Sequence, residues 1–281
     1  MSLFFFQLGN ELRKMFARKR TYIGFGAFFI MECLMLLSFN MPGTRRHMRH
    51  MIEENGYVFD EYFSGLTVAF DIVSFTAVLF GGLYLALVSG DLVAKEVEDG
   101  TLRMMLCRPV TRARIIILKY ISCVIYTVAL ILFIAASALI AGLLYRGWGG
   151  MFVFAPLERI VALHDATTGF HRYLESIPLL ALSLVSISSL GFMFSCFNMK
   201  PAAAAITTLS VIFLDFIFRN IPYFESMQPY FITTHMAAWL QAYVAYPPWW
   251  SVAEDYAYLL AMDATFLVVA LAVFQRRDFK A

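Results

Sequence analysis

Long apolar runs alternate with short polar segments along this chain, and six of the runs are long enough to cross a membrane. A membrane-spanning helix needs about 20 mostly apolar residues. The predicted spans are residues 22–40, 66–89, 115–145, 177–198, 202–218 and 256–274. The fourth and fifth are joined by little more than residues 199–201, which indicates an antiparallel helical hairpin. The pattern predicts an all-α integral membrane protein in which residues 1–281 form a single transmembrane domain.

Residues 4–20, ahead of the first span, have the pattern of an amphipathic helix. At about 100° per residue, one face carries Phe4, Phe5, Leu8, Leu12, Met15 and Phe16, and the other carries Gln7, Asn10, Glu11, Lys14 and Arg18. A helix of this kind lies in the headgroup region, with its basic residues toward anionic lipid. We therefore expect an interfacial helix before the first span.

The connection between the fifth and sixth spans differs from the other polar segments. Residues 220–255 contain no Lys or Arg and are rich in Tyr, Trp and Phe, which are residue types that gather at membrane interfaces. Residues 231–243 within it are predicted to form a re-entrant or interfacial helix that ends before Pro247 and Pro248.

Composition supports the membrane assignment and indicates an orientation. Hydrophobic residues make up 60% of the chain and charged residues only 15%, against roughly 25% in soluble domains. The net charge of +2 gives no reason to expect a nucleic-acid partner. Lys and Arg are about twice as numerous on the side of the predicted spans that holds both termini, so this side is expected to face the cytoplasm, with the chain in the inner membrane.

A charged segment separates the second and third spans. Glu96, Glu98 and Asp99 precede Thr101, and Pro109 ends any helix before the basic residues that follow. So many charges between two spans suggest that the segment meets a partner in the aqueous phase. We predict a short helix over residues 91–105 that docks onto a soluble protein.

Four acidic residues fall inside predicted spans, namely Glu32, Asp71, Asp215 and Asp263. Glu32, Asp263 and Asp215 are the candidates for a translocation path. Ionisable groups in a bilayer are costly to bury and often line a transport route. The alternative for Glu32 and Asp263 is that neighbouring helices satisfy them. Asp215 and Arg219 lie four residues apart and can pair on one helix face.

Other candidate chemistry is sparse. The four cysteines are widely separated and form no CxxC pair, so neither a disulfide framework nor a metal site is predicted. The segment from His47 to Met51 contains possible copper ligands but also fits an ordinary surface loop, and the choice stays open. No GxxxxGK[ST] motif occurs, so any ATP chemistry belongs to another polypeptide.

One motif carries a family resemblance. It runs through Glu96-Val97-Glu98-Asp99-Gly100-Thr101-Leu102 and Arg108-Pro109-Val110-Thr111-Arg112 to Lys119. This pattern resembles the loop after the second span in the ABC type-2 permease family. The chain departs from it at Cys107 and Arg108, which are more polar than usual, and at Lys95 before the acidic residues.

The resemblance implies the membrane subunit of an ATP-driven exporter, which is not itself an enzyme. Two such subunits, identical or related, would sit on two cytosolic ABC ATPase subunits that hold ATP and magnesium. Residues 91–105 would be the coupling helix. The implied ATPase-coupling residues are Asp91, Glu96, Glu98, Asp99, Thr101, Arg103, Pro109 and Arg112. Among them, we expect Glu96, Glu98 and Arg103 to contact the ATPase, and Pro109 and Arg112 to fix the helix end.

Two alternatives remain at this stage. An ATPase-driven complex that transports nothing, but transmits force through residues 146–176, would share every cytosolic feature. A membrane-embedded enzyme with an outer-face site would leave the charged segment unexplained. The sequence indicates neither the substrate, nor the direction of transport, nor whether the dimer is homomeric or heteromeric.

Overall fold

The computed structural model describes residues 2–17, 19–54, 58–102 and 110–277, and most of these residues are helical. The α-helices are α1 (Ser2–Ala17), α2 (Lys19–Phe39), α3 (Pro42–Glu54), α4 (Phe59–Tyr62), α5 (Gly65–Val73), α6 (Gly82–Glu98), α8 (Arg112–Arg146), α9 (Ala166–Cys196), α10 (Pro201–Arg219), α11 (Ile232–Met236) and α12 (Trp249–Arg276). A π-helix, η1 (Ser74–Gly81), joins α5 to α6. The remaining elements are the 3₁₀ helices η2 (Pro156–Glu158), η3 (Pro222–Tyr230) and η4 (Ala237–Tyr243) and the strands β1 (Met151–Ala155) and β2 (Ile160–His164).

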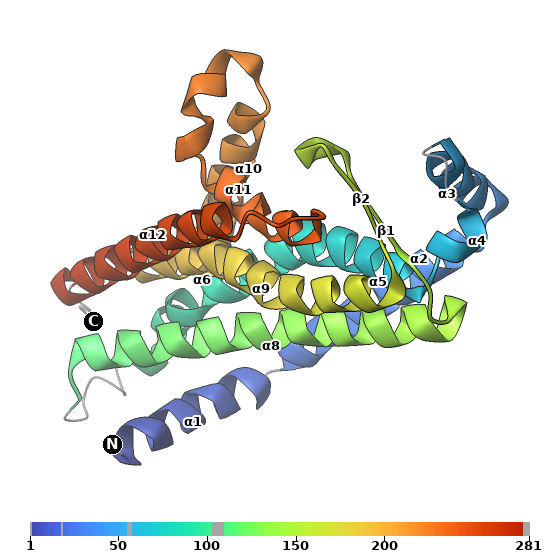
Figure 1. Cartoon of the computed structure of the whole chain (residues 1–281). Coiled ribbons are helices and arrows are strands. Elements are labelled where there is room, and N and C mark those ends of the chain that lie inside the picture. Colours follow the sequence, from blue (N-terminus) through green and yellow to red (C-terminus); the bar gives the residue numbers. More distant parts are fainter. Residues whose placement is uncertain (1, 18, 55–57, 103–109, 278–281) are drawn as a thin grey trace.

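The six predicted membrane spans are confirmed. Six helices are long and apolar enough to cross a membrane, covering residues 21–39, 65–98, 112–146, 166–196, 201–219 and 249–276. The protein is therefore a multi-pass membrane protein. Two ends of the bundle are distinct in Figure 1: the α6–α8 end, where α6 and α12 finish and α8 starts, and the hairpin end, which carries α3, α4 and the two strands.

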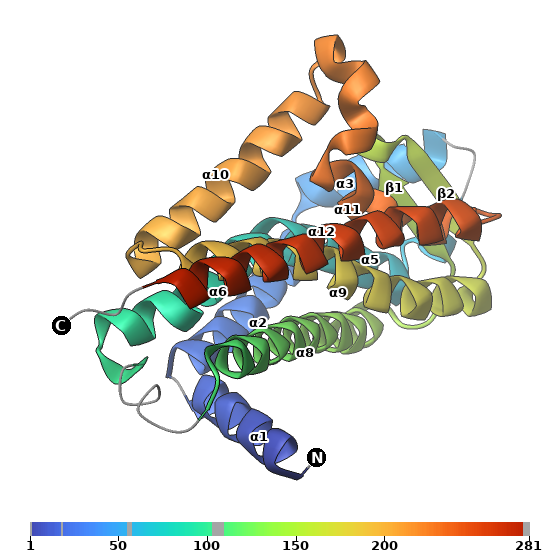
Figure 2. The ribbon, with the colours of Figure 1, turned by 90° about the vertical axis from the view of Figure 1, so that its left-hand side faces the viewer.

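The fourth span, α9, is the centre of the bundle. In the most apolar stretch of α9, 72% of the residues are buried, compared with 17% in α10 and 22% in α2. It packs against α6, α8 and α12, and Figures 1 and 2 both show it between these helices. The serines of this span fit its central place, because Ser183, Ser186, Ser188 and Ser189 are buried and allow close helix packing.

The helix predicted over residues 91–105 does not begin as a separate element at residue 91, and its last residues, 103–105, lie outside the described part of the chain. Residues 65–98 form one uninterrupted helix through α5, η1 and α6, so residues 91–98 are the last turns of the second span. Gly90 lies inside this helix, where it allows close packing against α10. A Cβ at this position would lie 3.0 Å from the backbone N of Ala205. The chain turns only at Gly100, whose φ of +70° suits glycine.

The hairpin end adds a small β-sheet that the all-α expectation lacked. β1 and β2 pair antiparallel with Met151 opposite His164, and the turn between them places Arg159 at a φ of +55°. The segment Met151-Phe152-Val153-Phe154-Ala155 is short and rich in β-formers, but it lies between two long helical runs that dominate the local pattern. The segment after α8, up to residue 176, is thus a hairpin followed by the first turns of α9.

The helix predicted over residues 231–243 is present as α11 and η4. It is packed into the protein, because Trp239 and Tyr243 are buried. The ring centroids of Tyr243 and Phe70 lie 4.9 Å apart. The Tyr243 carbonyl also accepts a hydrogen bond from His164 Nε2 at 2.6 Å. This segment therefore caps the hairpin end of the bundle.

Candidate coupling site at the α6–α8 end

A buried lysine joins three helices at the α6–α8 end. Lys119 of α8 is 2% exposed, and its Nζ lies 3.0 Å from Glu11 Oε2 of α1 and 2.7 Å from Glu96 Oε2 of α6. Lys14 adds a second cation to Glu11 at 2.8 Å. We call Lys119, Glu11 and Glu96 the Lys119 cluster. The Lys119 cluster connects α1 to the second and third spans. Its charges are largely removed from water, so each depends on the others for its partner.

The sequence places each member by simple helix geometry. Lys119 lies seven residues, about two turns, after the start of α8 at Arg112. Glu11 belongs to the polar face of α1, and where α1 packs on α8 Glu11 is left only 9% exposed. Burial by itself would raise the pKa of Glu11, but the Lys119 and Lys14 ammonium groups outweigh it and hold the pKa below its ordinary value of 4.5.

Further contacts at this end connect the other spans. Arg112 donates to the carbonyl oxygens of Gln275 and Arg277 at 3.1 and 2.9 Å, so the start of α8 caps the end of α12. Arg277 in turn donates to the carbonyls that end α9, with Phe197 O at 2.9 Å. Ser195 of α9 accepts hydrogen bonds from the backbone N–H groups of Val93 and Ala94 of α6, each at 2.9 Å. These contacts join α6 to α9, and join α12 to both α8 and α9.

The tip of the α6–α8 connection presents charge to solvent. Glu98, Asp99 and Thr101 are exposed, whereas Leu102 is buried and anchors the turn. Glu96 differs from its predicted role as a surface contact: it points inward to Lys119, because residues 91–98 continue a span whose inner face is packed. Asp91 is likewise buried. The predicted coupling residues Arg103 and Pro109 lie outside the described residues.

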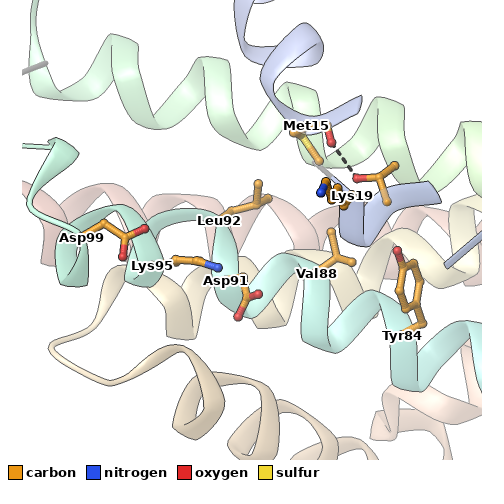
Figure 3. Close-up of a pocket in the computed structure, with 9 residues that line it drawn as sticks. Met15, Lys19, Tyr84, Val88, Asp91, Leu92, Lys95 and Asp99 are labelled. Atoms are coloured by element: carbon orange, nitrogen blue, oxygen red, sulfur yellow. Dashed lines mark hydrogen bonds between the residues drawn. The ribbon is translucent and has the colours of Figure 1, made fainter. Parts of the chain in front are cut away.

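A cavity of about 390 Å³ lies between the last turns of α6 and the junction of α1 and α2. Asp91, Lys95 and Asp99 line it from α6, and Met15 and Lys19 line it from the other side, as Figure 3 shows. The α1–α2 junction is itself fixed, because Thr21 Oγ1 donates to Met15 O at 2.6 Å. The cavity separates α6 from this junction, and α1 is connected to α6 through the Lys119 cluster.

The three candidates for a translocation path have different neighbours. Asp215 accepts hydrogen bonds from the backbone N–H groups of Ile232 and Thr233, so it caps the N-terminus of α11; its possible partner Arg219 binds Glu158. Asp263 of α12 is buried beside serines of α9. Glu32 lies between α2 and α8. The structure thus does not bring these carboxylates together, and their role in translocation stays a prediction.

The segment from His47 to Met51 lies on α3 at the hairpin end, where His50 faces Glu54 at 3.4 Å and Met48 is buried. Among the residues that the structure describes, no group of three or more His, Cys, Asp or Glu side chains is arranged to hold a metal ion. The geometry of the described chain therefore directs attention to the α6–α8 end.

Together these features define a class: a multi-pass helical membrane protein whose spans are cross-linked by polar contacts next to a charged tip. The family model described as "ABC-2 family transporter protein" matches residues 7–221, and the chain belongs to this family. The family resemblance drawn from the motif around Glu96 is confirmed. Membrane proteins of this family work with ATPase subunits in ABC transporters.

A curated relative is similar over a shorter stretch. The uncharacterized protein YhcI of Bacillus subtilis (strain 168) is 30% identical over 80 residues, which are 28% of this chain and 25% of that protein. The chain thus matches about a quarter of this relative's length.

The sequence pattern includes Glu11 and Lys119, but it does not identify either of them as a site residue. Glu11 was placed on the polar face of α1, and Lys119 ended the family motif. A signal for both was available, since a lysine five residues inside a 31-residue apolar run needs a buried counter-charge. The partner itself is set by tertiary packing and is not visible in the sequence.

Proposed function

We propose that this protein is the permease subunit of an ATP-driven ABC exporter. The α6–α8 end would face the cytoplasm of the cell, with the chain in the inner membrane and both termini inside. Two ABC ATPase subunits would bind there and carry ATP and magnesium, and a second permease protomer would complete the transporter. Hydrolysis takes place on the separate ATPase, and this chain moves the substrate across or out of the membrane.

The observation that carries this proposal is the pairing of an exposed charged tip with a buried polar network directly behind it. Glu98, Asp99 and Thr101 are accessible to a partner, and charged residues of this kind suit the rim of a protein interface. Glu96, one turn earlier, is bound to Lys119 inside the bundle. The tip therefore serves recognition, and the Lys119 cluster serves transmission.

The mechanical argument follows from helix continuity. Residues 65–98 form one helix of 34 residues, which is roughly 50 Å long at 1.5 Å per residue. When the ATPase subunits close, a push on the tip moves the end of this helix as a rigid rod. Lys119 and Ser195 carry the motion to α1, α8 and α9, so the spans reorient together.

The test separates recognition from transmission with two variants. In Glu98→Lys/Asp99→Lys the tip is reversed in charge, and we expect the ATPase to be lost from the purified complex. In Glu96→Gln the tip is intact, and we expect the ATPase to bind normally while its hydrolysis rate no longer responds to this subunit. Glu53→Lys, an exposed acidic residue at the hairpin end, is the matched control and should change neither quantity.

Complex formation is measured by co-purification, and coupling by ATPase rates in lipid nanodiscs. If the double tip variant retains the ATPase at wild-type stoichiometry, the tip is not the docking surface. If Glu96→Gln lowers ATPase binding as much as the tip variant does, the division between recognition and transmission is wrong. The size-exclusion elution of each variant is compared with that of the wild type, so that a misfolded variant is not mistaken for one that has lost ATPase binding.

A further inference from the structure

A groove between α2 and α8 contains the carboxyl group of Glu32 in a mostly apolar wall that also includes the hydroxyl groups of Ser137 and Tyr145. It has a volume of about 520 Å³, within the roughly 300–1,000 Å³ of small-molecule sites. Leu36, Ile140 and Leu144 are among its apolar lining residues. Both Ile140 and Leu144 are more than half exposed on the outside of the bundle, so the groove opens toward lipid. We call it the Glu32 groove.

Glu32 is 1% exposed, yet it is only partly satisfied by the protein. Its Oε1 accepts a hydrogen bond from Ser137 Oγ at 2.9 Å. Its Oε2 is buried and has no hydrogen-bond partner in the part of the chain that the structure describes. A carboxyl oxygen in this setting is costly unless another group supplies a proton or a positive charge.

Contacts between α2 and α8 flank Glu32 in both directions along these two helices. Toward the α6–α8 end, the rings of Phe25 and Phe133 pack at 5.0 Å. Toward the hairpin end, Tyr145 donates a hydrogen bond to Asn40 at 2.8 Å. Glu32 lies thirteen residues along α2 from Lys19, roughly 20 Å at 1.5 Å per residue, and therefore at membrane depth.

We propose that the Glu32 groove binds a membrane-dissolved amphiphile with one protonated amine and an apolar tail. The amine would meet Glu32 Oε2, and the tail would lie along the apolar walls. Charge complementarity favours this occupant, because the described residues that line the groove include one acid and no base. A phospholipid fits less well, since its phosphate belongs at the membrane surface and would be repelled by the carboxylate.

The experiment uses the full chain in phosphatidylcholine nanodiscs with tritiated dodecylamine as the probe. No ATPase is added, so the result is independent of the proposed transport function. Two variants test the site: Glu32→Gln removes the charge at constant size, and Ala141→Phe fills the groove. Two controls match them. Glu53→Gln removes the charge of an acid that does not line the groove, and Ala136→Phe adds the same ring at an exposed position of α8 outside the groove.

We expect saturable binding that weakens at least about tenfold in Glu32→Gln, the range for a lost hydrogen bond to a charged group. Ala141→Phe should abolish binding, and both controls should stay within about twofold of the wild type. Uncharged dodecanol should compete at least about tenfold less well than dodecylamine.

Three results would overturn the proposal. Wild-type affinity in Glu32→Gln would show that the carboxyl does not select the amine. Equal competition by dodecanol would indicate ordinary lipid contact. Dissociation of a dimer by Ala141→Phe, seen by native mass spectrometry, would identify this face as an interface between two protomers.

Discussion

Replacement of Lys119 by methionine tests whether the Lys119 cluster holds the α6–α8 end together. The lysine side chain is 2% exposed, and the side chains of its partners Glu11 and Glu96 are 11% and 9% exposed. Water therefore screens these charges only weakly. Removal of one member of a buried ion pair leaves the others in a low-dielectric surrounding and typically costs roughly 3–5 kcal/mol. Methionine keeps most of the apolar stem, so we expect a loss of this size with little change in packing.

Two comparisons separate this effect from a general loss of positive charge. Lys95→Met removes an exposed lysine from α6 and should cost less than about 1 kcal/mol. Glu96→Gln should cost less than Lys119→Met, because Lys119 keeps Glu11 at 3.0 Å. Lys119→Met combined with Glu11→Gln and Glu96→Gln should recover part of the stability, since no uncompensated charge of the cluster remains.

Buried cysteines supply the assay. Cys123 and Cys196 are 2% and 0% exposed and react with a thiol-specific dye only when the fold opens. In a background with Cys33 and Cys107 replaced by serine, the midpoint of dye labelling on heating reports unfolding. A midpoint for Lys119→Met equal to that for Lys95→Met would refute the buried cluster as a source of stability.

Three further predictions concern other parts of the molecule. The lowered pKa of Glu11 means that its contribution to stability is complete above its ordinary value of 4.5 and is lost as pH falls through the lowered value. The difference in melting midpoint between wild type and Glu11→Gln should therefore be constant above pH 4.5 and shrink as the pH falls below it. Gly142→Ala should destabilise by about 1–3 kcal/mol in the same dye assay, because its Cβ would overlap the backbone of Gly65, whereas Gly26→Ala, with open space around it, should not. Asp215→Ala should cost about 1–3 kcal/mol and speed hydrogen exchange in residues 232–236, and unchanged exchange there would contradict its role as the cap of α11.

The spans were predictable because hydropathy over about 20 residues is a strong signal. The single motif around Glu96 was also sufficient for the family, which the match over residues 7–221 confirms. The predicted boundary between the second span and the segment that follows it was wrong, because this span extends to residue 98. The charges of Asp91 and Glu96 suggested an exposed helix, but both side chains are buried in the last turns of α6.

The failure has a physical reason that applies to the site as a whole. A charge in a helical pattern shows that a partner is required, but the pattern does not show whether the partner is solvent, another protein or a distant residue. For Glu96 the partner is Lys119, 23 positions away in the chain, and for Lys119 it is also Glu11, 108 positions away. Such pairs are created by packing of α1, α6 and α8, and one sequence alone contains no signal for them. The hairpin at residues 151–164 was missed for a similar reason, since two five-residue strands give little periodicity.

The central claim is that this permease works with a separate ABC ATPase bound at the α6–α8 end. The most direct test is to tag the C-terminus, solubilise native membranes in a mild detergent, purify the protein and identify stoichiometric partners by mass spectrometry. We expect an ABC ATPase in a complex of two permease and two ATPase subunits. A folded, intact preparation that carries no ATPase would contradict it.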